Sequence, residues 1–115
     1  MRIWYPISPS QLDNKRLLAE HNEILIIARA IMGINKGYRN HPETKRWVGH
    51  TKALKQRHDD LAKEMVKRGF NHKSPWPDNC INSNDTEEFP KTFWEPLDVM
   101  IEKLNAKQKL IKGNQ

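Results

Sequence analysis

The stretch of sequence that decides the fold is residues 17–32, which read LLAEHNEILIIARAIM. Residues that can share one helix face recur in it every three or four positions: Leu17, His21, Ile24, Ala28 and Ile31. Mostly apolar residues at this spacing predict a helix whose apolar face is buried. Ser8-Pro9-Ser10-Gln11 has the pattern of a capped helix start, and Gly33 favours a helix end, so we expect the helix to begin at this start and end at Met32.

A second helix is predicted after a loop. Residues 33–41 hold two glycines and two asparagines, a composition typical of loops. Pro42 then opens a helix in which residues spaced three and four apart can pack on one face. These residues are Trp47, Thr51, Leu54, His58, Leu61 and Met65. Lys67-Arg68-Gly69 places cations and a glycine together and is predicted to end this helix.

The rest of the chain is predicted to form a long loop and a third helix. Residues 70–92 show no period, and we expect three aromatic side chains to pack them down: Phe70, Trp76 and Phe89. Pro96 begins the third helix and Gly113 ends it. Its core-facing residues are expected to be Leu97, Met100, Ile101, Leu104 and Ile111. Residues 1–115 are thus predicted to form a single all-α domain of three main helices, with a long irregular loop before the third.

Composition limits where the protein works and what it binds. The 115 residues carry a formal charge of +6, and the pI is near 9.6, so polyanions are favoured partners. No apolar run is long enough to span a membrane, and the first residues lack the apolar stretch of a signal peptide. Cys80 is the single cysteine and cannot form an internal disulfide. We therefore expect a cytoplasmic protein, and the charge by itself leaves nucleic acid as one candidate among polyanions.

The carboxylate of Glu23 is the first candidate for chemistry. On the predicted helix it lies beside Ile26 and Ile27, with Arg16 two turns earlier. A carboxylate in surroundings that are both apolar and cationic is typical of functional sites. The alternative is an ordinary surface glutamate paired with a basic residue.

The α-amine of Met1 is the second candidate. Arg2 is too large for the initiator methionine to be removed, so we expect Met1 to be retained. An α-amine has an intrinsic pKa of about 8, so a useful fraction is unprotonated at neutral pH and can attack a carbonyl carbon to form an imine. Such an amine matters only if the terminus is anchored in a site, and the residues that can anchor it are Ile3, Trp4, Tyr5 and Ile7.

No metal site or cofactor is expected from the sequence. The histidines show no recognised zinc spacing, and they are His21, His41, His50, His58 and His72. His21 is expected to pack in the core, whereas His50 follows Gly49, which could admit a DNA strand or another helix. No glycine-rich phosphate loop, nucleophilic serine or cysteine motif, or paired acidic metal motif is present.

Basic residues gather around the predicted loop and the start of the second helix. They are Lys36, Arg39, Lys45 and Arg46, with Tyr38 among them. Phosphate groups favour such helix starts. The alternative is a solvated charged face.

Several motifs together resemble the family of pyrimidine-dimer DNA glycosylases and abasic-site lyases typified by phage endonuclease V. The opening Met1-Arg2-Ile3-Trp4 is followed by Leu17-Leu18-Ala19-Glu20-His21-Asn22-Glu23. Further matches are Gly37-Tyr38-Arg39-Asn40-His41-Pro42-Glu43-Thr44, Gly49-His50 and Lys67-Arg68-Gly69-Phe70-Asn71. The resemblance covers roughly residues 1–75 and implies a fold of three helices.

The resemblance also implies a reaction and its residues. The family's nucleophile, an N-terminal amine, falls on Met1, and its catalytic glutamate falls on Glu23. The amine displaces a damaged base, and the resulting imine leads to strand cleavage by β-elimination. The implied partner is damaged double-stranded DNA, bound by a monomer without cofactor or metal. Arg2 matches a phosphate-binding arginine of the family, and Arg16 stands where the family has another basic residue. Taken with the basic residues noted above, the expected DNA-binding residues are Arg2, Arg16, Asn22, Arg29, Arg39, Lys45, Arg46 and His50, and a protein bound to DNA would associate with the nucleoid.

The sequence departs from the family where the lesion would be recognised. Asn22 and Ile26 stand where the family has arginines, and Lys107–Gln115 has no counterpart of the phage enzyme's aromatic, basic tail. Lyase activity at abasic sites is therefore expected before specificity for pyrimidine dimers. Two alternatives stay open: a non-catalytic DNA-binding module with the same fold, and a helical interaction protein whose charge is incidental.

Overall fold

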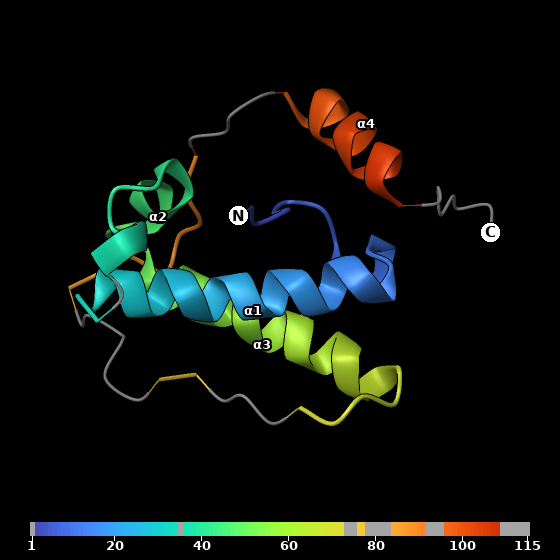
Figure 1. Cartoon of the computed structure of the whole chain (residues 1–115), viewed down its shortest axis with the longest axis horizontal. Helices are drawn as coiled ribbons and strands as arrows, with labels where there is room; N and C mark the ends of the chain where they lie inside the picture. The colour runs from blue at the N-terminus through green and yellow to red at the C-terminus, as the bar shows by residue number, and fades with distance from the viewer. Residues whose placement is uncertain (1, 35, 73–75, 78–83, 92–95, 109–115) are drawn as a thin grey trace.

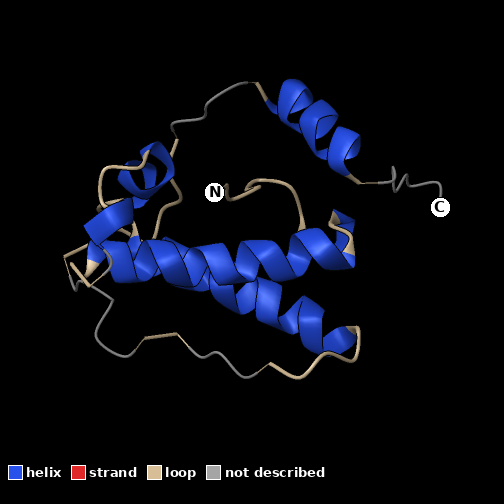
Figure 2. Cartoon of the chain, viewed as in Figure 1, coloured by secondary structure: helices blue, strands red, loops and turns tan. Residues whose placement is uncertain are grey.

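The computed structural model describes residues 2–34, 36–72, 76–77, 84–91 and 96–108. Within these ranges the chain is all-α, as predicted, and contains no strand (Figure 2). The α-helices are α1 (Asn14–Ile31), α2 (Pro42–Trp47), α3 (Thr51–Lys67) and α4 (Leu97–Lys107), and the short 3-10 turns are Pro9–Gln11 and Lys36–Tyr38. Figure 1 shows α1 alongside α3, with the N-terminal segment between α1 and α4.

The first predicted helix is interrupted near its start, so its predicted beginning is wrong. Ser8 caps only the short turn Pro9–Gln11, and Leu12 then adopts an extended backbone with its side chain fully buried. Asp13 caps α1 instead, because its side chain accepts a hydrogen bond of 2.8 Å from the Arg16 amide. The predicted end is confirmed, since α1 stops at Ile31 and Gly33 follows with φ of +85°.

The second predicted helix is two helices, α2 and α3, joined by residues 48–50. Val48 is extended, and Gly49 has φ of +85°, a conformation in which an α-helix cannot continue. The sequence prediction missed this break because both sides keep the same apolar face. Every residue predicted for that face is buried, and α3 ends before Gly69 as expected.

The third predicted helix is shorter and more exposed than expected. α4 ends at Lys107, and the predicted continuation to Gly113 with Ile111 lies outside the described residues. Met100 and Leu104 are buried, as predicted. Leu97 and Ile101 are 50% and 40% exposed, so their assignment to the core is wrong. α4 therefore contacts the core through Met100 and Leu104, one buried side chain in each of two successive turns.

The core joins the helices to the N-terminal segment. Ile3, Trp4 and Ile7 lie in the same cluster of buried residues as Leu17 and Trp47. Phe70 and Phe89 are partly buried and Trp76 is buried, as expected for the irregular region. Among the described helices, none is both long and apolar enough to cross a membrane.

Candidate active site

A buried ion pair fixes the N-terminal segment on the helices. Glu20 of α1 accepts hydrogen bonds from the Arg57 Nε at 2.6 Å and from the Trp4 amide at 3.0 Å. Arg57 of α3 also donates from Nη1 to the Ile7 carbonyl at 2.8 Å. Burial raises the pKa of the Glu20 carboxyl, although the Arg57 guanidinium acts in the opposite direction. The pair thus attaches two points of the extended N-terminal segment to α1 and α3.

Glu23 lies one turn further along α1 and meets the same segment. Its Oε2 accepts a hydrogen bond of 2.9 Å from the Arg2 backbone amide. The Glu23 side chain is half-buried and borders a hollow of about 320 Å³. The residues lining this hollow are Arg2, Trp4, Arg16, Ala19, Glu23 and Lys107. The structure therefore brings Glu23 beside the peptide group at the very start of the described chain.

The hollow is cationic around one aromatic ring. The Arg2 guanidinium lies 4.8 Å from the centroid of the Trp4 ring, and the Lys107 ammonium lies 5.8 Å from it. Arg16 approaches from α1. The three cations favour an anionic ligand. The single carboxylate among them can accept a proton from such a ligand or stabilise a positive charge that develops on it.

The C-terminal end of α4 closes one side of the hollow. Arg16 donates from Nη2 to the Lys107 carbonyl at 2.7 Å. Gln108 is buried and joins the end of α4 to the segment before α1. Its Oε1 accepts a hydrogen bond from the Asp13 amide at 2.9 Å, and its Nε2 donates one to the Gln11 carbonyl at 2.8 Å. These contacts hold Lys107 beside the start of α1, although the two regions are far apart in sequence.

The other residues predicted to bind DNA occupy different places. Asn22 and Arg29 are exposed and lie two turns apart on α1, so they can share a face. Arg39 precedes α2 and Lys45 lies within it, and both are exposed. Met1, the predicted nucleophile, lies outside the described residues.

Two of the residues predicted to bind DNA, Arg46 and His50, form hydrogen bonds with other groups of the protein. The Arg46 side chain is fully buried and donates to Glu43 at 3.0 Å. The Trp47 indole donates to the same carboxylate at 2.8 Å. His50 is half-buried, and its Nδ1 is 2.9 Å from the Glu88 carbonyl oxygen.

Sequence reasoning missed three residues that shape the site. Glu20 and Arg57 stand on the apolar faces of their helices, three residues after Leu17 and Leu54 respectively, and this misplaced charge is a signal that could have identified them. Lys107 carries no such signal, because only the docking of α4 brings it to the hollow.

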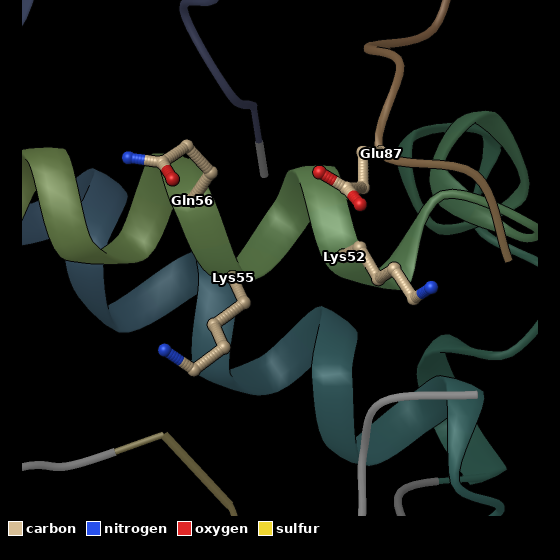
Figure 3. A pocket seen from close by; sticks show the side chains of 4 residues that line it. All are labelled: Lys52, Lys55, Gln56 and Glu87. Atoms are coloured by element: carbon tan, nitrogen blue, oxygen red, sulfur yellow. The ribbon is translucent and has the colours of Figure 1, made fainter. Parts of the chain in front are cut away.

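A second hollow, of about 290 Å³, lies between α3 and the segment that precedes Phe89 (Figure 3). It is lined by Lys52, Lys55, Gln56 and Glu87. Lys55 is held by Asp59 at 2.8 Å. The lining mixes both charges on exposed or half-exposed side chains, so no reaction is assigned to it.

The chain matches the family described as pyrimidine dimer DNA glycosylase over residues 1–78. The match includes the N-terminal segment, α1, α2 and α3, and it excludes α4. No curated protein and no solved structure matches the chain.

Proposed function

The chain belongs to the pyrimidine dimer DNA glycosylase family, and we propose that it is a DNA repair enzyme which excises a damaged base and then cleaves the strand at the abasic site. The observation that carries the proposal is the hydrogen bond of 2.9 Å between the Arg2 amide and Glu23 Oε2. Covalent geometry keeps the α-nitrogen of Met1 within roughly 4 Å of the Arg2 nitrogen. An amine at residue 1 would therefore work in the neighbourhood of the Glu23 carboxylate.

The proposed reaction begins with attack of the Met1 amine on the sugar C1′ of the damaged nucleotide. A nitrogen–C1′ bond forms while the bond from C1′ to the base breaks, and the base leaves with the bonding electrons and takes up a proton. The sugar ring opens to give an imine. Glu23 stabilises the positive charge that develops at C1′ and accepts and returns protons.

Strand cleavage follows from the imine. The imine acidifies the C2′ proton, and loss of this proton expels the 3′-phosphate as the C3′–oxygen bond breaks. Water then hydrolyses the imine and releases the enzyme. The proposed base for the C2′ proton is Glu23, because it is the carboxylate that lines the hollow.

The cations around the hollow are proposed to bind the phosphates on either side of the damaged nucleotide. Arg2, Arg16 and Lys107 would contact them directly, and the exposed side chains of Asn22 and Arg29 would extend the surface along α1. Arg46 is given a positioning role, because its buried guanidinium is paired with Glu43. Unstacking the nucleotide costs a few kcal/mol, and a damaged base lowers that cost.

Borohydride trapping on DNA with an abasic site tests the proposal. The wild-type protein should form a covalent adduct that peptide mapping locates at residue 1, and mass spectrometry of the intact protein should show Met1 as the first residue. Glu23→Gln should reduce cleavage at least a hundredfold while DNA binding stays within about threefold of wild type. Glu102→Gln, an exposed carboxylate on α4, is the matched control and should cleave like the wild type.

Three results would overturn parts of this scheme. An adduct that maps to a lysine would remove the role of Met1. Undiminished cleavage by Glu23→Gln would remove the role of the carboxylate. Salt-dependent DNA binding with no adduct at high protein concentration would instead identify a non-catalytic DNA-binding module of the same family.

A further inference from the structure

Three histidines from three separate segments converge beneath α1. They are His21 of α1, His58 of α3 and His72 of the segment that follows α3. The His21 Nε2 is 3.1 Å from the His58 Nε2 and 2.9 Å from the His72 Nε2. Figure 1 shows the chain turning back where it leaves the end of α3. None of the three histidines lines the hollow at Glu23.

The contacts among these rings cannot all be ordinary hydrogen bonds. A neutral imidazole nitrogen either donates one proton or offers one lone pair, in a single direction in the ring plane. The His21 Nε2 faces two other ring nitrogens at hydrogen-bond distance and can serve only one of them well. A cation at the centre would instead receive a lone pair from every ring.

The protonation of His58 is set from outside the cluster. Its Nδ1 lies 3.1 Å from the Asp59 carboxylate, which in its ionised form can only accept a hydrogen bond. The other oxygen of the same carboxylate accepts a hydrogen bond of 2.8 Å from the Lys55 ammonium. The His58 proton is therefore on Nδ1, and the Nε2 lone pair faces the cluster. A carboxylate bonded to the far nitrogen of a histidine is the usual support of a zinc ligand.

The three rings differ in how far they are buried. His21 and His58 are only 5% and 2% exposed, whereas His72 is half-buried. Solvent therefore reaches the cluster at His72, whereas His21 and His58 are shielded from it.

We propose that His21, His58 and His72 bind a divalent zinc-type ion through their Nε2 atoms, with water as the fourth ligand. Zinc–nitrogen bonds of about 2.1 Å in a tetrahedral site place the nitrogens roughly 3.4 Å apart. The His21 nitrogen is 3.1 and 2.9 Å from those of His58 and His72, and all three ligand atoms lie within 4.8 Å of one another. Binding of the ion would therefore move the two pairs that include His21 slightly apart and draw His58 and His72 together, the latter by at most about 1.4 Å. This site departs from the absence of a metal expected from the sequence.

The ion would act as a structural link between α1, α3 and the chain after α3. The ligands are separated by 37 and 51 positions, so the link closes long loops of the chain. Trp76 is buried against His58, with ring centroids 5.7 Å apart, and would be fixed by the same link. The site is separate from the proposed reaction, and its test does not depend on cleavage activity.

Zinc binding to the full chain, after removal of metals with a chelator, tests the proposal. We expect one zinc ion per chain by calorimetry, and an absorption spectrum typical of tetrahedral nitrogen coordination with cobalt as the probe. At free zinc a hundredfold above the Kd, the Tm should rise by about 10 °C. Absence of both binding and the Tm shift in the wild type would overturn the proposal without any variant.

Variants locate the ion. His72→Ala removes the most exposed ligand and should weaken zinc binding at least a hundredfold, and Asp59→Asn should weaken it about tenfold while keeping the stoichiometry. His41→Asn is the matched control, because His41 caps α2 away from the cluster and asparagine keeps the cap. Equal zinc affinity in His72→Ala and His41→Asn would show that the ion binds elsewhere and would refute the site.

Discussion

Replacing Arg57 with methionine removes the cation that neutralises the most deeply buried carboxylate of the molecule's described part. The Glu20 and Arg57 side chains are 0% and 4% exposed. In Arg57→Met, Glu20 loses donors at 2.6 and 3.2 Å and keeps the Trp4 amide at 3.0 Å. The Ile7 carbonyl loses a donor at 2.8 Å. Methionine preserves most of the apolar length of the side chain, so the change isolates the charge.

The magnitude follows from these losses. Breaking a buried pair by removing one partner costs about 3–5 kcal/mol, and an unsatisfied buried carbonyl adds about 1–3 kcal/mol. Protonation of Glu20 limits the total, because the neutral carboxyl is easier to bury. We expect the free energy of unfolding to fall by about 4 kcal/mol at pH 7, a large part of the 5–15 kcal/mol typical of a domain.

The pH dependence gives this prediction a sign. Burial already raises the pKa of Glu20 in the wild type, and loss of Arg57 should raise it further. Below the ordinary pKa of a glutamate, both folded and unfolded states are protonated and no penalty arises. Above the raised pKa of Glu20 in the folded wild type, Glu20 is ionised in the wild type but still protonated in the folded variant. Over that range the variant should lose stability relative to wild type at up to about 1.4 kcal/mol per pH unit.

Urea unfolding followed by tryptophan fluorescence at pH 5 and pH 8 is the assay. The loss should be smaller at pH 5, and Glu20→Gln combined with Arg57→Met should be more stable at pH 8 than Arg57→Met alone. A loss below about 1 kcal/mol, or one that is equal at both pH values, would refute the reasoning. Arg57→Met should also reduce borohydride trapping, because the N-terminal segment loses one of its attachments.

Five further substitutions test the packing by the same urea assay. Gly49→Ala should cost about 1 kcal/mol from backbone strain alone, since φ is +85° and no atom lies within 4 Å of an added Cβ, whereas Gly37→Ala should change stability by less than about 0.5 kcal/mol. Met100→Ala should cost roughly 2–5 kcal/mol and Ile101→Ala, at a position 40% exposed, less than about 1 kcal/mol; equal costs would contradict the docking of α4. Trp47→Phe should cost about 1–3 kcal/mol, because a buried carboxylate loses a donor at 2.8 Å, and a neutral effect would show that this bond contributes nothing.

DNA binding gives a further expectation, measured by titration at several salt concentrations. Arg29→Gln should weaken binding to all sequences and reduce the magnitude of the salt slope by about one, because Arg29 is exposed on α1 and is proposed to contact a phosphate. Lys63→Gln is the matched control on the exposed face of α3 and should leave the slope unchanged. An unchanged slope in Arg29→Gln would remove this residue from the DNA surface.

The fold class and most of the core were predictable because their signals are local. A period of three to four residues identifies a buried helix face without reference to any other segment. The predicted face of α3 is buried, and so is that of α1 except at Ile31, which is partly buried; the glycines that end both helices have positive φ. The break between α2 and α3 escaped prediction, because Gly49 interrupts the backbone while the apolar period continues across it.

The candidate site was predictable only in part. The motif resemblance selected Glu23, and the structure places the Arg2 amide 2.9 Å from its carboxylate. The resemblance could not separate Arg46, whose side chain is fully buried, from the exposed Arg39. Exposure depends on packing against other segments, so a motif alone does not determine it.

The sequence by itself determined that this chain is helical, which faces of α1 and α3 are buried, and which family it belongs to, because periodicity, caps and motifs are properties of neighbouring residues. The tertiary structure decided which polar groups on those faces meet. The pairing of Glu20 with Arg57, the arrival of Lys107 at the hollow and the convergence of His21, His58 and His72 all join residues far apart in the chain. Their distances are set by how the helices pack, and no spacing in the sequence encodes them.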